Sequence, residues 1–293
     1  MKTNVFFFGV GFCARTLIRR WPDIEASGTV RTEEKAAALR ASGVDAHVFD
    51  GERAGAGVAE ALSRADAIVV SIPPRGEGPL GVFGRQIASA PRLGRIVYYS
   101  TVGVYGEHGG AWVDETSETR ATAPRSLARL EEERRWAEAG RGMGAEVDLL
   151  RLPGIYGPGR NALARLRDGS ARRVVKPGHV TNRAHVEDIA EATRLALTRG
   201  LPGQIWNVTD DEPAPPQDVI AYAAGLLGVP APPEEPFDPA GMSDMAASFF
   251  ADEKRVSNAK ARRLLGFAPL HPTYREGLRA LLASGEGRNA PIA

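Results

Sequence analysis

Residues 5–14 read Val-Phe-Phe-Phe-Gly-Val-Gly-Phe-Cys-Ala, and this stretch decides the fold. Its apolar start predicts a buried strand, and the residues behind the turn predict a helix. The turn has the pattern Gly-x-Gly-x-x-Ala, the fingerprint of a dinucleotide-binding strand-turn-helix unit with Ala in the third small position. An ordinary tight turn between a strand and a helix is the alternative interpretation.

Each small residue of the fingerprint has its own physical task. Gly9 permits the tight turn, Gly11 lets the backbone approach a pyrophosphate, and Ala14 lets the helix pack against the strand. The free N–H groups and the positive dipole end of the helix attract phosphates. We therefore predict that a dinucleotide cofactor binds at Gly9, Gly11, Phe12, Cys13 and Ala14.

The end of the second predicted strand, residues 28–32, indicates which cofactor is used. An acidic residue there suits the free ribose of NAD, whereas an arginine suits the 2′-phosphate of NADP. This chain has Arg31 followed by Thr32, so both are predicted to bind the cofactor. We favour NADP, with NAD as the alternative, because two glutamates follow directly and Arg31 could be an ordinary surface residue.

Predicted strands and helices alternate through the first half of the chain. Further strands are expected at residues 46–49, 67–71, 95–100 and 146–151. This alternation predicts an α/β fold of right-handed βαβ units, a Rossmann-type doubly wound parallel sheet. Ligands of such sheets lie at the carboxyl ends of the strands. On this basis the path of the cofactor is expected to include Asp50, Ser71, Ile72 and Pro73.

Composition excludes several other classes of protein. The net charge is +1 and 25% of residues are charged, so neither nucleic acid nor membrane is expected as a partner. Cys13 is the only cysteine, which leaves no disulfide and no cysteine-based zinc site, and no histidine spacing predicts a metal. The apolar run near the start is too short for a signal peptide, so we expect a cytoplasmic protein.

Several groups of residues farther along complete a pattern. They are Ser100-Thr101 with Val104-Tyr105-Gly106, Arg151 with Ile155-Tyr156-Gly157-Pro158-Gly159, His185-Val186-Glu187-Asp188-Ile189-Ala190, Trp206-Asn207-Val208, and Lys254 to Pro269. In this order the chain resembles an atypical extended short-chain dehydrogenase/reductase, a group also described as NAD-dependent epimerase/dehydratase-like. The resemblance spans nearly the whole chain.

The resemblance implies a division into two domains. Residues 1–157 would form the Rossmann domain and residues 158–293 mainly a small substrate lobe, with residues 183–208 returning to the first domain. Much of the lobe would come from residues 161–182 and from the proline-rich residues 210–250. A homodimer through the helix predicted at residues 124–139 is also implied, although we expect the apolar stripe Leu127, Leu130 and Trp136 of that helix to be core.

The catalytic pattern of the group departs here from its usual form. The group uses a Ser or Thr on the fifth strand and a Tyr-x-x-x-Lys on the next helix. Thr101 matches the hydroxyl residue, but Arg125 replaces the Tyr and Arg129 replaces the Lys. A guanidinium stays protonated, so Arg125 cannot be a general acid or base. The resemblance still implies that Ser100, Arg129 and Pro153 line the cofactor and that Thr101 and Arg129 take part in catalysis.

A proton donor must therefore come from elsewhere if the chain is an enzyme. We expect Tyr105 first, because it follows Thr101 in the loop after the strand, although packing within the turn is the simpler interpretation. By composition alone, the other candidates are Tyr156, His108, Asp114, Glu115 and His185. His185 precedes a predicted helix, and a helix-entry role is its simpler interpretation.

Two functions fit the sequence. The first is an NADP-dependent oxidoreductase acting on a small carbonyl or alcohol, with sugar-like compounds among the candidate substrates and a sugar-nucleotide epimerase or dehydratase as a variant. The second is a non-catalytic NADP(H)-binding sensor or scaffold on the same fold, because a fold does not by itself determine function.

Overall fold

The computed structural model describes residues 2–53, 55–199, 201–242 and 249–287. The chain folds into two compact units, each built from three separate stretches of sequence. Unit 1 contains Met1–Thr101, Pro124–Arg151 and Ile189–Trp206; unit 2 contains Val102–Ala123, Leu152–Asp188 and Asn207–Ala293. Residues 102–123 thus belong to the second unit in the structure, and the domain boundaries expected from the sequence remain a prediction.

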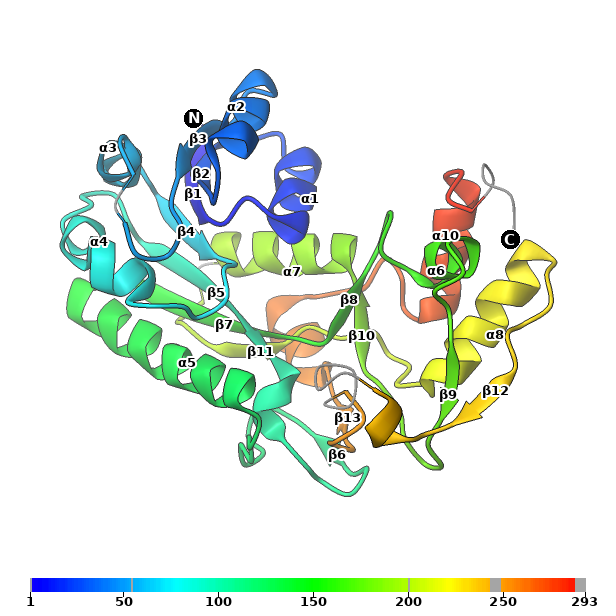
Figure 1. Cartoon of the computed structure of the whole chain (residues 1–293). Coiled ribbons are helices and arrows are strands. Elements are labelled where there is room, and N and C mark those ends of the chain that lie inside the picture. The colour runs from blue at the N-terminus through cyan, green and yellow to red at the C-terminus, as the bar shows by residue number, and fades with distance from the viewer. Residues whose placement is uncertain (1, 54, 200, 243–248, 288–293) are drawn as a thin grey trace. The chain divides into compact units, whose positions relative to one another are not determined.

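Unit 1 is organised around a seven-stranded parallel sheet with the order β11-β7-β5-β4-β1-β2-β3 (Figure 1). Its strands are β1 (Thr3–Phe8), β2 (Ile24–Val30), β3 (Asp45–Val48), β4 (Ala67–Val70), β5 (Arg95–Thr101), β7 (Glu146–Leu152) and β11 (Ile205–Asn207). The chain runs outward from β1 through β2 to β3, crosses back to β4, and then runs outward on the other side. This reversal between β1 and β4 is where doubly wound sheets bind ligands. The predicted Rossmann-type fold is confirmed.

Helices cover both faces of this sheet. They are α1 (Phe12–Arg20), α2 (Glu33–Ala41), α3 (Val58–Ser63), α4 (Gly78–Ala88), α5 (Pro124–Met143) and α7 (Val186–Thr198). Successive side chains of a strand point to opposite faces of the sheet. Two neighbouring residues of β5 therefore show which helix covers each face. The Tyr98 ring stacks on Trp136 of α5, with centroids 6.5 Å apart, whereas the Tyr99 hydroxyl lies 2.8 Å from the Thr193 hydroxyl of α7. Helices α5 and α7 therefore lie on opposite faces.

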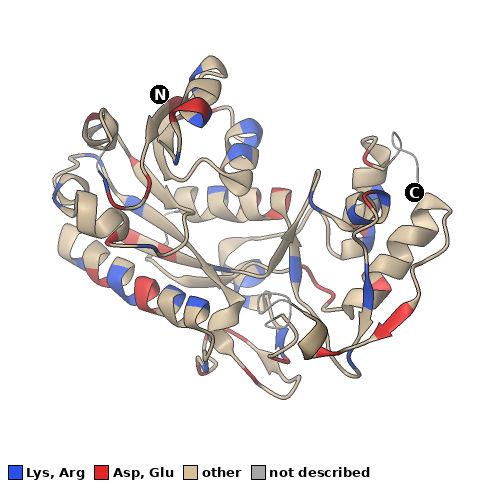
Figure 2. Ribbon diagram, viewed as in Figure 1, with Lys and Arg blue, Asp and Glu red and all other residues tan. Residues whose placement is uncertain are grey.

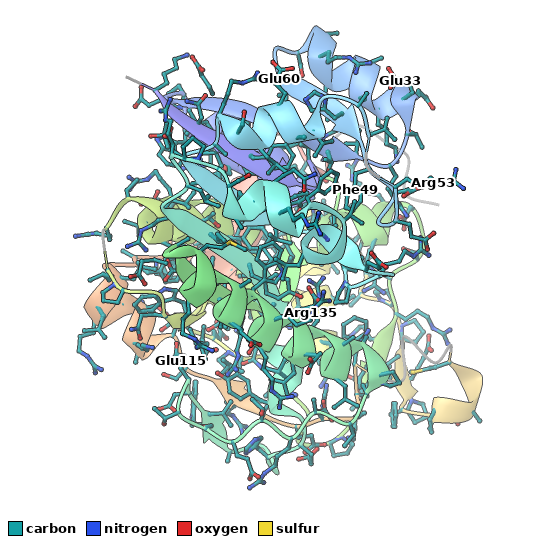
Figure 3. All side chains as sticks on the ribbon, turned by 90° about the vertical axis from the view of Figure 1, so that its left-hand side faces the viewer. Glu33, Phe49, Arg53, Glu60, Glu115 and Arg135 are labelled. Atoms are coloured by element: carbon teal, nitrogen blue, oxygen red, sulfur yellow. The ribbon has the colours of Figure 1, made fainter. Side chains whose placement is uncertain are left out.

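Aromatic residues fill the core between the sheet and helices α3 to α5. Phe8 of β1 packs edge-on to Phe6 at 4.9 Å and to Phe49 at 6.1 Å, and Phe49 also contacts Phe83 of α4 at 5.1 Å. Phe49 lies inside this layer, whereas Arg53 points away from it (Figure 3). Fully burying each of these rings favours folding by roughly 1.5–3 kcal/mol, which explains the apolar run of β1.

The buried face of α5 differs from the predicted apolar stripe. Trp136 is fully buried, as expected, but Leu127 is 47% exposed, so the expectation that it belongs to the core is wrong. Ser126 and Glu133 are buried instead. A polar face can be buried here because Glu133 finds partners inside the unit, described below. The exposed side of α5 carries alternating acidic and basic residues (Figure 2).

The described part of unit 2 contains three two-stranded parallel sheets and short helices. The strand pairs are β8 (Gly154–Tyr156) with β10 (Arg183–His185), β9 (Arg173–Val175) with β12 (Glu234–Pro236), and β6 (Trp112–Val113) with β13 (Arg255–Val256). The helices are α6 (Ala162–Arg167), α8 (Pro216–Leu227), α10 (Tyr274–Ala283) and the short turns η1 (Val102–Tyr105), η2 (Pro239–Gly241) and η3 (Ala261–Leu265). The proline-rich stretch therefore contains a helix and a strand, apart from residues 243–248, which lie outside the described part.

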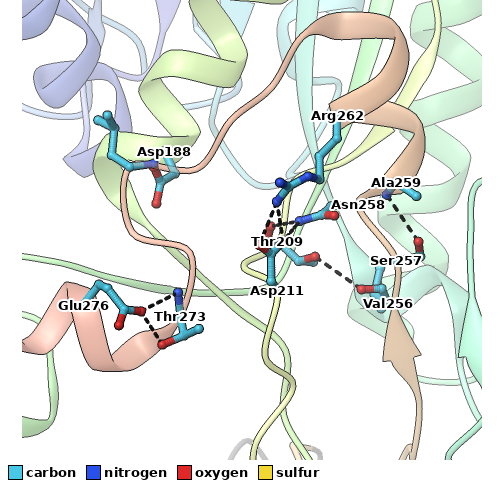
Figure 4. Close-up of polar contacts among 11 residues, drawn as sticks. Asp188, Thr209, Asp211, Val256, Ser257, Asn258, Ala259, Arg262, Thr273 and Glu276 are labelled. Atoms are coloured by element: carbon cyan, nitrogen blue, oxygen red, sulfur yellow. Dashed lines mark hydrogen bonds and ion pairs between the residues drawn. The ribbon is translucent and has the colours of Figure 1, made fainter.

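The core of unit 2 is built around Tyr156, Leu163, Ile220, Tyr274 and Leu278. Tyr156 packs directly against Gly277 of α10, where an added Cβ would lie 2.0 Å from its hydroxyl oxygen. Helix α10 begins with a capping box in which Thr273 and Glu276 bond reciprocally (Figure 4). Among the described residues, no helix is long and apolar enough to cross a membrane.

Candidate functional site

The turn after β1 requires glycine at its first position. Gly9 has φ +97°, and a Cβ there would lie 2.5 Å from the Ile72 side chain and 2.9 Å from the Ser71 hydroxyl. The Gly9 N–H donates to the Thr29 hydroxyl at 3.1 Å, and the Ser71 hydroxyl donates to the Gly9 carbonyl at 2.7 Å. The end of β4 thus holds the turn from one side and β2 from the other.

The start of α1 is open where a phosphate would bind. A Cβ on Gly11 would meet no atom within 4 Å, and no side chain caps α1. By contrast, α2 is capped by Thr32 and α6 by Asn161, whose side chains accept N–H bonds at 3.4 and 3.0 Å. Uncapped N–H groups at a helix start bind anions. Ala14 is fully buried and Cys13 is 8% exposed, so the helix packs closely on the sheet.

Arg31 is exposed at the carboxyl end of β2. No protein group within the described residues accepts a hydrogen bond from its guanidinium. Glu33, which could compete for it, pairs instead with Arg40 of the same helix. Thr32, the neighbour predicted to bind cofactor, uses its hydroxyl to cap α2. Arg31 is therefore the charged group available to an anion at this position.

The other residues predicted along the cofactor path lie at the ends of β3 and β4. Asp50 accepts N–H bonds from Glu52 and Arg53, each at 3.0 Å, which hold the pKa of its carboxyl below the usual range. Ile72 and Pro73 follow β4 and line a small hollow together with Tyr98. The carbonyl of Ile72 also accepts a bond from Arg129.

Arg129 reaches from α5 to the carboxyl ends of β4 and β5. Its Nη1 donates to the Ile72 carbonyl at 3.1 Å, the Tyr98 hydroxyl at 3.1 Å and the Tyr99 carbonyl at 2.8 Å. Within the described chain, Nε and Nη2 have no protein acceptor. The arginine in the Lys position therefore links α5 to the sheet through Nη1. Its other two nitrogens, Nε and Nη2, keep their N–H groups for another acceptor. Burial raises the pKa of the Tyr98 hydroxyl to about 12, so Tyr98 stays neutral.

A buried ion pair lies deeper in unit 1, and sequence reasoning missed it. Glu133 receives bonds from Arg151 Nε at 3.1 Å and Nη2 at 2.8 Å, and Ser100 donates to the same carboxylate at 2.5 Å. The three side chains come from α5, β7 and β5. Ser100, predicted to contact the cofactor, is only 5% exposed and is bonded to Glu133. The sequence did contain one signal of this pair. Arg151 is a charged residue between two leucines of a predicted strand.

Tyr105, the first candidate for a proton donor, is fully buried in unit 2. Its hydroxyl donates to the Asn207 side chain at 2.8 Å. The Asn207 N–H in turn donates to the Glu115 carboxylate at 2.7 Å. Burial raises the pKa of Glu115 above its usual value. Asn207 therefore joins two loop residues that sequence reasoning considered separately as acid–base candidates.

The remaining candidates are distributed through both units. Thr101 ends β5 in unit 1, and Arg125 is exposed in the first turn of α5. In unit 2, His108 and Asp114 lie in the loop that contains β6, and Pro153 lies between β7 and β8. Tyr156 and His185 are buried opposite each other on β8 and β10, with ring centroids 5.1 Å apart, and burial raises the pKa of the Tyr156 hydroxyl.

Two buried carboxyls in unit 2 were not anticipated. Asp210 is 3% exposed, and burial outweighs the attraction of Arg183 and raises its pKa to about 8. Asp188 is 2% exposed, and burial raises its pKa although the Leu270 N–H donates to it at 2.6 Å. Neither residue has a local sequence signal, because its burial arises only in the folded chain.

Comparison with known proteins now places this geometry in a family. Residues 85–209 match the model of the NAD dependent epimerase/dehydratase family. Protein YeeZ of Escherichia coli strain K12 is 31% identical over 221 residues, covering 71% of this chain and 77% of YeeZ. The chain belongs to the NAD-dependent epimerase/dehydratase family. The resemblance stated from the sequence is thereby confirmed.

Two solved structures share the fold of this chain. A structure described as that of a functionally unknown conserved protein from Silicibacter pomeroyi DSS is 41% identical, with a TM-score of 0.88, and the match covers 97% of this chain and all of that one. UDP-glucuronic acid 4-epimerase from Bacillus cereus, solved with UDP-glucuronic acid and NAD, is 18% identical with a TM-score of 0.74, over 95% of this chain and 97% of that one. At that identity the second likeness shows the fold alone.

Proposed function

We propose that this family member binds NADP(H) at the start of α1 and acts as an oxidoreductase on a small carbonyl or alcohol compound. The observation that carries the proposal is the open, uncapped start of α1 behind a glycine turn. The helix offers its N–H groups to an anion there, because Gly11 at the N-cap position has no side chain to cap them.

The residues around this turn fit a phosphorylated dinucleotide. Phe12, Cys13 and Ala14 would direct backbone N–H groups at the pyrophosphate. The Arg31 guanidinium would donate two charge-assisted hydrogen bonds to the 2′-phosphate, which favours NADP over NAD. The two remaining donors of Arg129 would hold a ribose hydroxyl. The bound cofactor would supply or accept a hydride.

Thr101 would polarise the substrate oxygen with its hydroxyl, the role that the family pattern gives to this position. The proton cannot come from Arg125, whose guanidinium remains protonated. The Tyr105 hydroxyl is bonded to Asn207 inside unit 2, so we do not assign it the proton either. The Bacillus cereus enzyme, which shares this fold, was solved with UDP-glucuronic acid, and on that precedent we include keto sugars among the substrates to test.

A non-catalytic sensor is the second candidate. It is favoured by the two arginines at the dyad positions and by the use of Arg129 Nη1 to fasten α5 to the sheet. Both candidates require the same cofactor site, and they differ only in turnover. A homodimer, a cytoplasmic location and the lack of nucleic-acid or membrane partners also remain predictions.

The test is calorimetric titration of NADPH and NADH into the wild-type chain, Arg31→Ala and the control Arg85→Ala. Arg85 is an exposed arginine on α4 of the same unit. Losing a charged hydrogen bond costs about 1.5–3 kcal/mol, so Arg31→Ala should bind NADPH roughly ten- to a hundredfold more weakly. NADH binding and the Arg85→Ala variant should change little.

Equal wild-type affinity for both cofactors would remove the NADP assignment, and no binding of either would remove the proposal. Given NADPH binding, a panel of aldehydes, ketones and keto sugars then separates the two candidates. NADPH oxidation that is lost in Thr101→Ala, with NADPH affinity retained, supports the enzyme. NADPH binding without turnover on the panel favours the sensor.

A further inference from the structure

Three side chains of unit 2 converge at the start of α7. The Glu187 carboxylate oxygen lies 3.2 Å from His271 Nε2 and 3.9 Å from His185 Nδ1. All three potential ligand atoms lie within 4.8 Å of one another, and the two imidazole rings are 4.0 Å apart. We propose that His185, Glu187 and His271 bind a divalent cation of the zinc class.

The backbone holds these ligands in place from two separate elements. His185 is the last residue of β10 and lies opposite Tyr156 of the neighbouring strand β8. Glu187 follows in the first turn of α7. His271 arrives from a segment 84 residues beyond Glu187. The Leu270 N–H donates to the Asp188 carboxylate at 2.6 Å, which links the His271 segment to the first turn of α7. Ligands fixed by packed backbone cost little ordering entropy on binding.

Burial and access both suit a bound ion. His185 and His271 are 2% and 8% exposed, so their imidazoles lie inside the unit. The Glu187 side chain keeps 25% of its exposure, which gives an ion a path from solvent. The Nδ1 of His185 accepts the Glu187 N–H at a long 3.3 Å, which identifies it as the nitrogen with the lone pair. A metal bound to this atom would replace the hydrogen bond from the Glu187 N–H.

The donor set selects the class of metal. Two imidazoles and one carboxylate form the ligand set of catalytic zinc sites, which leave a fourth position for water. Calcium and magnesium take oxygen ligands and do not suit two imidazoles. The Glu187 carboxylate supplies the one negatively charged oxygen ligand of the cluster. A direct hydrogen bond between His271 and Glu187 is the competing explanation, and it requires no metal.

The experiment uses the full-length chain with any affinity tag removed and with metals stripped by chelator. Zinc chloride is titrated by calorimetry, and cobalt chloride is followed by visible absorption, since tetrahedral cobalt with nitrogen ligands absorbs strongly. The variants are Glu187→Gln, His271→Asn and the control His108→Asn. His108 belongs to unit 2 but lies outside the cluster, where its ring contacts two backbone carbonyls.

We expect one equivalent of zinc to bind, and affinity to fall roughly tenfold or more in both cluster variants while His108→Asn retains it. Circular dichroism checks that each variant is folded, and Glu187→Gln preserves the shape of a partly exposed side chain if His271→Asn does not fold. Two results would overturn the proposal: no stoichiometric binding of zinc or cobalt by the wild type, or binding that Glu187→Gln leaves unchanged. Both results are independent of NADPH binding.

Discussion

Arg151 donates two hydrogen bonds to the carboxylate of Glu133, one from Nε at 3.1 Å and one from Nη2 at 2.8 Å. Both side chains are about 5% exposed or less. The pair joins α5 to β7, and Ser100 of β5 completes it. An isolated charge at this depth would be strongly unfavourable, so each partner depends on the other.

Removing one partner of this pair should destabilise the chain severely. Glu133→Gln leaves Arg151 charged and buried, and we expect a loss of about 3–5 kcal/mol in the free energy of unfolding. Urea denaturation measures it. Glu131→Gln is the control on the same helix, where an exposed pair with Arg134 should contribute less than about 1 kcal/mol. Similar losses in the two variants would contradict the burial argument.

The two fingerprint glycines should respond differently to alanine. Gly9→Ala introduces a Cβ 2.5 Å from Ile72 in a left-handed conformation, so it should lower the free energy of unfolding by about 1–3 kcal/mol. Gly11→Ala meets no atom and should leave stability nearly unchanged, but it should weaken NADPH binding, because the Cβ occupies the approach of the pyrophosphate. Thermal unfolding and NADPH calorimetry separate the two effects. Unchanged NADPH affinity in Gly11→Ala would place the cofactor elsewhere.

Stability should depend on pH through Asp210. Burial raises the pKa of its carboxyl from the ordinary value of 3.8 to about 8 in the folded chain. Because the folded state then binds the proton more tightly, this carboxyl favours folding at low pH, and its contribution is lost as the pH rises from about 4 through about 8. The slope is at most about 1.4 kcal/mol per pH unit.

Asp210→Asn removes this titration without changing the size of the side chain. As the pH rises over that range, the wild type should therefore lose stability relative to Asp210→Asn. Above that range the difference in their free energies of unfolding should become constant. Urea denaturation at a series of pH values measures the difference. A difference that is constant with pH would show that Asp210 is already ionised in the folded chain.

A pair of helical glycines tests the packing of unit 2. Gly277→Ala places a Cβ 2.0 Å from the Tyr156 hydroxyl, so overpacking should cost about 1–3 kcal/mol or more. Gly225 lies exposed in α8, and an added Cβ there meets no atom within 4 Å. Gly225→Ala should therefore stabilise by about 0.5–1 kcal/mol. Thermal unfolding compares them, and a neutral Gly277→Ala would mean that Tyr156 can move aside.

The sequence by itself determined the α/β fold and the turn at Gly9. Both are local: a strand, a turn and a helix succeed one another within about a dozen residues, and steric limits on φ restrict the residue types that each position accepts. The alternation of such units then restricts the sheet to a few topologies. The buried side of α5 was misjudged at Leu127, because helix periodicity does not show which polar residue will find a buried partner.

Only the tertiary structure decided which distant residues meet. Tyr105 and Asn207 are 102 positions apart, and Glu187 and His271 are 84 apart, so no spacing rule connects them. All four residues belong to unit 2, which the chain builds from three separate stretches of sequence. The raised pKa of Asp210 also arises there, since it depends on the removal of water by surrounding groups from many parts of the sequence.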